Sequence, residues 1–139
     1  MSTNQPESVV LPRTGDRPLS FTGTLLATAN TATVAGKDKL RWFEVRVWRT
    51  TAGALVAEAA YRTRWEGEAD QTIPITAQDE KGLADWLLGV TWNWRIIGYP
   101  PGAQFVPKQE RLIAELEAAW RRCVGELLAR LPGTSETIA

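Results

Sequence analysis

The sequence predicts a single α+β domain, in which a four-stranded antiparallel β-meander is followed by two α-helices that pack on the sheet. Three observations predict it. Four runs between residues 19 and 76 alternate apolar and polar side chains, which is the period of a half-buried strand. Two later segments, near 76–89 and 107–131, repeat apolar residues at helical spacing. A length of 139 residues, 44% of them hydrophobic, suits one core.

The first two predicted strands are residues 19–27 and 40–50. The first alternates polar threonines with apolar side chains, and Gly36 lies in the loop that follows it. The second gives the strongest strand signal of the chain, and its odd-numbered face holds the apolar residues Phe43, Val45 and Val47.

The third predicted strand, residues 54–65, follows a three-residue loop that ends at Gly53, which we expect to be left-handed. This loop sets the register between the second and third strands. It places Phe43, Val45 and Val47 opposite Tyr61, Ala59 and Ala57, which makes one wholly apolar face. A two-residue loop would instead place charged side chains on that face, so we reject it.

The fourth predicted strand, 72–76, contains Pro74 and therefore belongs at an edge of the sheet. Thr76 is the predicted cap of the first helix, which ends near Gly89. Pro107 suits the first turn of the last helix, residues 107–131. The predicted core face of the sheet consists of Phe21, Leu25, Phe43, Val45, Val47, Leu55, Tyr61, Ile73 and Ile75. The helices should add Leu83, Trp86, Leu87 and Val90 from the first and Leu112, Leu116, Trp120, Cys123, Val124, Leu127, Leu128 and Leu131 from the last.

Outside the domain, 19–132, we expect a flexible N-terminal arm at 1–18 and a flexible tail at 133–139, because both are polar. The start of the chain lacks the layout of a signal peptide, and no apolar run reaches transmembrane length. The expectation is a soluble, cytoplasmic protein without membrane contact.

The order strand–strand–strand–strand–helix over roughly residues 19–90 resembles that of the Whirly, PUR-alpha and related single-stranded nucleic-acid binders. The resemblance concerns the order of elements, and no motif of those families transfers residue by residue. It implies binding to single-stranded DNA or RNA through the sheet.

Composition favours binding over catalysis. The chain has seven tryptophans but no histidine, which is the commonest catalytic base and metal ligand. Its 16 Lys and Arg balance its 16 Asp and Glu, so any electrostatic role must be local. We therefore expect no enzymatic activity, no cofactor and no metal.

The candidate ligand-binding residues lie on the noncore face of the central hairpin. They are Trp42, Arg46, Trp48, Arg62 and Arg64, an interleaved set of aromatic and basic side chains that suits stacked bases and phosphates. Glu44 and Glu58 on the same face would oppose phosphate. The alternative is that the last helix covers this face.

A second aromatic patch, formed by Trp92, Trp94, Arg95 and Tyr99, follows the first helix into a Pro-rich loop. It could bind a sugar or a peptide, although such side chains more often close the end of a small core. Together with the apolar stripe of residues 107–131, this patch supports a second hypothesis, a protein-interaction or assembly subunit that includes a possible homodimer.

Two smaller features carry little chemistry. Glu66, Glu68 and Asp70 could bind Mg²⁺ or Ca²⁺, but a solvated acidic turn explains them better. Cys123 lies within the apolar stripe of the last helix, which predicts a buried, inert thiol.

Overall fold

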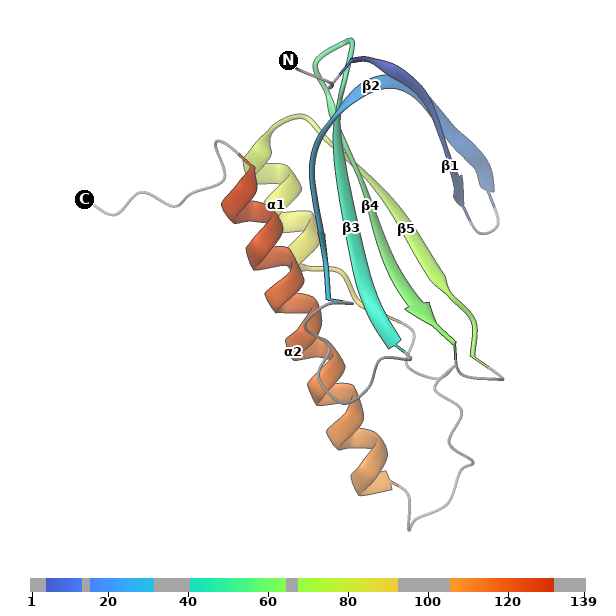
Figure 1. The fold of residues 1–139 in the computed structure, drawn as a ribbon, viewed down its shortest axis with the longest axis vertical. Coiled ribbons are helices and arrows are strands. Elements are labelled where there is room, and N and C mark those ends of the chain that lie inside the picture. Colours follow the sequence, from blue (N-terminus) through green and yellow to red (C-terminus); the bar gives the residue numbers. More distant parts are fainter. Residues whose placement is uncertain (1–4, 14–15, 32–40, 65–67, 93–105, 132–139) are drawn as a thin grey trace, which may run out of the picture.

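The computed structural model describes residues 5–13, 16–31, 41–64, 68–92 and 106–131. It is an α+β fold in which every strand pairs antiparallel with its neighbour in the chain, so the sheet is a five-stranded meander (Figure 1). The elements are β1 (Glu7–Arg13), β2 (Asp16–Asn30), β3 (Arg41–Thr50), β4 (Leu55–Thr63), β5 (Gln71–Ala77), α1 (Glu80–Leu88) and α2 (Val106–Arg130).

The fifth strand, β1, lies in the segment that we predicted as a flexible arm, so the predicted count of four strands is wrong. β1 pairs with the first half of β2, from Glu7 opposite Gly23 to Arg13 opposite Asp16. The reason is the short apolar run that contains Leu11, whose side chain is buried. The order that resembles the single-stranded nucleic-acid binders is therefore preceded here by an additional strand.

Both helices pack on one face of the sheet, which we call the inner face (Figure 1). Phe43, Val45 and Tyr61 are fully buried there, together with Leu83 of α1 and Leu127 of α2. Each such side chain contributes about 1.5–3 kcal/mol when it leaves water. The inner face is therefore the main core of the molecule.

The predicted register between β3 and β4 is confirmed. Phe43 pairs with Tyr61, Val45 with Ala59 and Val47 with Ala57. The amide of Thr50 donates to the carbonyl of Ala54 at 2.8 Å. Gly53 has a φ of 92°, the left-handed conformation that the three-residue loop requires. The position of β5 at an edge of the sheet, opposite β4, is also confirmed.

The predicted core face is wrong at Phe21 and Leu25, because β2 contains a bulge between Leu25 and Ala27. An extra residue in one strand shifts the alternation of side chains by one position. Leu25 pairs with Trp48, whereas Ala27 pairs with Val47. Phe21 and Leu25, which lie before the end of the bulge, therefore face away from the helices.

The sheet curls, so that β1 comes close to the other edge strand, β5. In Figure 1, β1 and the first half of β2 bend away from the helices and arch over the opposite face of the sheet. We call β1 with residues 16–22 of β2 the N-terminal hairpin. Beneath it lies a second, smaller apolar cluster in which Leu11, Trp48 and Val56 are buried, and Val9, Leu19, Phe21 and Leu25 pack against them.

The first helix begins one turn later in the chain than predicted. Asp79, not Thr76, is its N-cap, and its carboxylate accepts a hydrogen bond of 2.7 Å from the amide of Gly82. The aspartate is well suited to this role because it also places a negative charge at the positive end of the helix. Gly89 ends the helix as expected, but Trp86 of the predicted stripe is 62% exposed.

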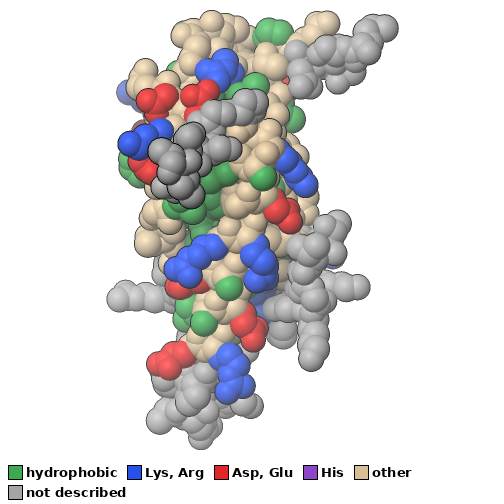
Figure 2. Space-filling view, turned by 90° about the vertical axis from the view of Figure 1, so that its left-hand side faces the viewer, with side chains coloured by type: hydrophobic (Ala, Val, Ile, Leu, Met, Phe, Trp, Pro, Cys, Tyr) green, Lys and Arg blue, Asp and Glu red, His purple; other side chains and the backbone are tan. Residues whose placement is uncertain are grey.

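The last helix contains Pro107 in its first turn and buries the predicted stripe from Leu116 to Leu131 against the sheet. Its other side is hydrophilic, and Figure 2 shows acidic and basic side chains intermixed on the helical side of the molecule. Within the described part of the chain, no helix is both long enough and apolar enough to cross a membrane.

Candidate functional site

The face of the sheet opposite the helices, which we call the outer face, carries the predicted ligand-binding residues. Trp42 pairs with Arg62 across β3 and β4, and Arg46 pairs with Glu58. Because α1 and α2 both pack on the inner face, neither covers these side chains. The alternative that the last helix buries this surface is therefore wrong.

Trp48, at the end of the outer face near the turn between β3 and β4, is covered by the N-terminal hairpin. Its side chain is only 2% exposed, and the ring of Phe21 meets it edge to face with a centroid distance of 5.6 Å. Its indole nitrogen is buried without a hydrogen-bond partner. The hairpin thus removes one of the two predicted stacking surfaces from solvent.

Trp42, at the opposite end of the outer face, near the start of β3, is only partly buried, and its aromatic ring is accessible. Its indole N–H donates to Glu44 Oε2 at 2.7 Å, which fixes the ring. The guanidinium of Arg64 lies over this ring, 5.3 Å from its centroid, in a cation–π contact. No described carboxylate forms an ion pair with Arg64.

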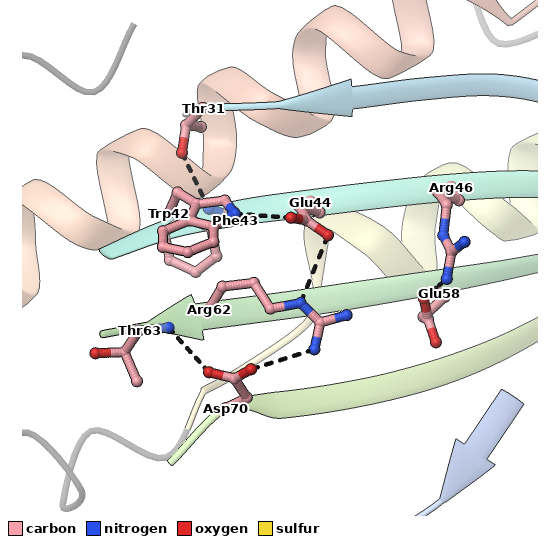
Figure 3. A network of polar contacts seen from close by, with 9 residues as sticks. All are labelled: Thr31, Trp42, Phe43, Glu44, Arg46, Glu58, Arg62, Thr63 and Asp70. Atoms are coloured by element: carbon pink, nitrogen blue, oxygen red, sulfur yellow. Dashed lines mark hydrogen bonds and ion pairs between the residues drawn. The ribbon is translucent and has the colours of Figure 1, made fainter. Parts of the chain in front are cut away.

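Arg62 lies between two carboxylates, as Figure 3 shows. Its Nε is 3.5 Å from Glu44 Oε1, and its Nη1 is 3.5 Å from Asp70 Oδ2. All three side chains are partly exposed, and such ion pairs contribute up to about 1 kcal/mol each. A competing anion could therefore replace either carboxylate at low energetic cost.

Arg46 forms a different kind of pair. It donates through Nη2 to Glu58, whose side chain is only 5% exposed, while Arg46 itself remains 45% exposed. Its guanidinium also lies 5.0 Å from the centroid of Trp48. An arginine has five N–H donors, so Arg46 can hold Glu58 and still offer donors to a ligand.

The charges of the described side chains around this site balance. Arg46, Arg62 and Arg64 provide three positive charges, and three carboxylates lie among them, from Glu44, Glu58 and Asp70. This balance limits long-range attraction of an anion. Binding here must depend on short-range contacts, namely stacking and direct hydrogen bonds.

A buried polar cluster that the sequence analysis missed lies at the same end of the sheet on the inner face. Arg41 Nη2 lies 2.5 Å from Glu68 Oε2, and both side chains are almost fully buried. The hydroxyls of Tyr61 and Thr63 also donate to Glu68, at 3.0 and 2.9 Å. The sequence contained a signal for this cluster, because Arg41 and Tyr61 both occupy odd-numbered positions, which face the core.

This cluster changes the pKa values of its members. Burial alone would raise the pKa of Glu68, but the hydrogen bonds from Arg41, Thr63 and Tyr61 outweigh it and hold that pKa below its usual range. Burial, followed by the contact with the Glu68 carboxylate, raises the pKa of Tyr61. Glu68 is therefore ionised and Tyr61 neutral at pH 7.

The acidic turn is neither fully solvated nor arranged as a metal site in the part that the structure describes. Glu68 is occupied by Arg41, and Asp70 accepts from the amide of Thr63 at 2.9 Å. Glu66 lies outside the described residues. Among the residues that are described, no group of three or more acidic or cysteine side chains could hold a metal ion.

The second aromatic patch is described only at Trp92. This residue is buried in the main core, 5.5 Å from Phe43 and 5.2 Å from Trp120 between ring centroids. Trp94, Arg95 and Tyr99 lie outside the described residues. The position of Trp92 agrees with the interpretation that it closes the end of the core.

The apolar stripe of α2, which could have formed a dimer, is used within the molecule. Leu116, Trp120, Cys123 and Leu127 are all buried in the main core. Burial raises the pKa of Cys123 to about 12, so its thiol is protonated and unreactive at neutral pH. An intermolecular coiled coil through this stripe would require the helix to leave the sheet.

Comparisons of the chain with protein-family models, with curated proteins and with solved structures give no match.

Proposed function

We propose that the protein is a small non-enzymatic binding module that contacts single-stranded nucleic acid through the outer face of its sheet. The observation that supports this most is the stacked pair of Trp42 and Arg64 beside Arg62, on a surface that neither α1 nor α2 covers. Arg46 extends the surface towards the middle of β3.

The chemistry of this surface suits a flexible strand. A base can stack on the plane of the Arg64 guanidinium or on an exposed part of the Trp42 ring, and each stacked base contributes about 1–3 kcal/mol. A phosphate can replace the exposed carboxylates at Arg62, each of which contributes up to about 1 kcal/mol. Stacking should therefore dominate the affinity.

A salt-dependent titration of fluorescently labelled oligo(dT) and oligo(U) tests the proposal. The informative variant is Arg62→Ala/Arg64→Ala, because neither residue is paired with a buried carboxylate. Arg46 is unsuitable as a first target, since its removal would leave the buried Glu58 without its partner. The matched control is Arg111→Ala/Arg121→Ala, which removes two exposed arginines from α2 on the helical side.

We expect binding at low salt that weakens as salt rises, because phosphate contacts release counterions. The Arg62/Arg64 variant should lose at least about tenfold in affinity, equivalent to the loss of one stacked base, and the α2 control should bind like the wild type. Equal affinity of the two double variants, or no binding at low salt, would contradict the proposal.

A second candidate function, protein interaction, is favoured by one specific observation on α1. Trp86 and Leu88 are 62% and 58% exposed. Leu88 also lines a hollow of about 380 Å³, together with residues that include Trp92, Trp120 and Arg121. Exposed tryptophan next to apolar surface is common at binding hot spots.

Sedimentation velocity tests the form of this candidate in which the partner is a second copy of the chain. Self-association that Trp86→Glu removes, and that Val10→Glu on the exposed side of β1 leaves unchanged, would support it. A monomer at all concentrations would contradict it.

A further inference from the structure

We propose that Trp48 is a second base-stacking site of the outer face, which the N-terminal hairpin covers and which becomes accessible when the hairpin swings away about Gly23. The inference rests on the proposed function, because it assigns a further residue and a closed state to the same surface. Four features of the structure support it.

The first feature is the way in which the hairpin is attached. The ladder between β1 and β2 ends at Gly23, and the ladder between β2 and β3 begins at the same residue. Residues 7–13 and 16–22 therefore have no strand pairing with the rest of the described sheet. A single backbone hydrogen bond, from Thr51 N to Thr22 O at 3.0 Å, is described just before the pivot. Opening would break this bond and the packing of the hairpin on the outer face and against β5, but no ladder among β3, β4 and β5.

The pivot itself is constrained to be glycine. A Cβ at position 23 would lie 2.8 Å from the carbonyl oxygen of Arg49 and 3.1 Å from the ring of Phe21. The backbone of β2 therefore passes close to β3 at the point where the strand changes partners. Gly23 lets the chain turn there, and it has no side chain that would obstruct a change of angle.

The second feature is that the hairpin packs on a cluster of its own. Leu11 from the hairpin is buried with Trp48 and Val56 from the sheet, and these residues are not part of the main core under the helices. Opening would therefore expose the small cluster and leave the main core intact. Local opening of this kind is typical of segments with few buried apolar contacts.

The third feature is an unsatisfied donor. The indole N–H of Trp48 is buried without an acceptor in the closed arrangement. A buried donor without a partner is unusual and disfavours the state that buries it. In the open state this N–H can donate to water or to a nucleic-acid oxygen, so opening gives it the acceptor that it lacks in the closed state.

The fourth feature is the alignment of Trp48 with the accessible part of the site. Trp42, Arg46 and Trp48 occupy even positions of β3 and therefore share one face. Trp42 and Trp48 are six residues apart, about 20 Å along a strand, which is about six nucleotides at the rise of stacked bases. Arg46, between them, can contact the phosphates of a strand that reaches both rings.

Hydrogen-exchange mass spectrometry on the full chain tests the opening directly. In the free protein, amides of residues 7–13 and 16–22 should exchange at least about tenfold faster than those of β3 and β4. A 12-nucleotide oligo(dT) should increase exchange in the hairpin further, because it selects the open state. Equal protection of the hairpin and of β3 and β4 in the free protein would overturn the inference.

Two variants of β1 then connect opening to affinity. Leu11→Ala weakens the packing of the hairpin and should tighten binding of the 12-nucleotide strand by about tenfold, because a larger fraction of molecules is open. Val10→Ala is the matched control, since Val10 is the neighbouring residue and is 63% exposed. Trp48→Leu added to Leu11→Ala should cancel the gain.

The outcomes separate this inference from the function on which it rests. Binding that leaves hairpin exchange unchanged or slower would overturn the role of Trp48 and retain the Trp42 and Arg64 site. Absence of binding at low salt would overturn both. If Leu11→Ala exchanges rapidly in β3 and β4 as well, the hairpin is part of the global fold and the inference is again overturned.

Discussion

Two networks of charge lie back to back at one end of the β3–β4 pair and differ mainly in burial. On the inner face, Arg41 and Glu68 are almost fully buried. On the outer face, Arg62 meets Glu44 and Asp70 while all three remain partly exposed (Figure 3). Arg41 pairs with Thr63 and Trp42 with Arg62, so the two networks occupy adjacent positions of the same strands.

The comparison shows that one strand pair can hold a structural network and an available one. A buried charge cannot be left without its partner, so Arg41 and Glu68 are fixed in place. An exposed pair is screened by water and exchanges partners at low cost. The same residue types are therefore part of the fold on one face and candidates for ligand binding on the other.

The largest effect should follow from removal of the buried carboxylate. Glu68→Ala removes the buried carboxylate that Arg41 contacts and should lower the free energy of unfolding by about 3–5 kcal/mol. Glu44→Ala, the matched change on the outer face, should cost at most about 1 kcal/mol. Chemical denaturation measures both losses. Similar losses for the two variants would contradict the distinction between a structural inner network and an available outer network.

A smaller loss should follow when the buried cluster keeps its charges and loses one hydroxyl. Tyr61→Phe removes the hydrogen bond of 3.0 Å to Glu68. Hydrogen bonds to charged groups are worth about 1.5–3 kcal/mol, and denaturation should give a loss in that range. No change in stability would show that Glu68 is satisfied without Tyr61.

The pH dependence of stability should report the buried network. The pKa of Glu68 in the fold lies below its usual 4.5, so its contribution is complete above about pH 4.5 and is lost as the pH falls through the lower folded value. The pKa of Tyr61 is raised above 10.0, so its contribution is complete below pH 10 and is lost at higher pH.

Denaturation midpoints across both pH ranges check this dependence. Glu68→Gln should flatten the acid side, and Tyr61→Phe should flatten the alkaline side. If Glu68→Gln leaves the dependence of stability on acid pH unchanged, the loss of stability at low pH comes from other carboxylates.

The smallest effect should follow from a change in the outer network. Arg62→Met keeps much of the apolar stem and removes both exposed ion pairs, so stability should change by less than about 1 kcal/mol and the change should shrink in high salt. A loss of several kcal/mol, insensitive to salt, would show that Arg62 is structural and would weaken the proposed binding surface.

The central part of the fold could be predicted from the sequence because its signals are local. The alternation of Phe43, Val45 and Val47 and the three-residue loop ending at Gly53 determine the β3–β4 register, which is confirmed. The long apolar stripe of α2 likewise predicts a helix that packs on the sheet.

The errors arise where tertiary contacts override the local pattern. The bulge between Leu25 and Ala27 reverses the faces of the preceding residues, and period-two counting cannot detect an inserted residue. β1 is too short and polar to predict alone, because its stability depends on β2 and on the cluster around Trp48. At the candidate site, the positions on β3 and β4 were predictable, whereas the cover over Trp48 was not.

The meander has a consequence for the order in which the protein can form during synthesis. Each strand pairs with the one before it, so the sheet can assemble as the chain emerges, largely by contacts between near neighbours. The inner face, however, is completed only by α2, which emerges after all five strands. Until Leu116 to Leu131 arrive, the nascent sheet presents apolar residues such as Phe43 and Val45 to water, and this is the stage at which the chain is most prone to aggregate.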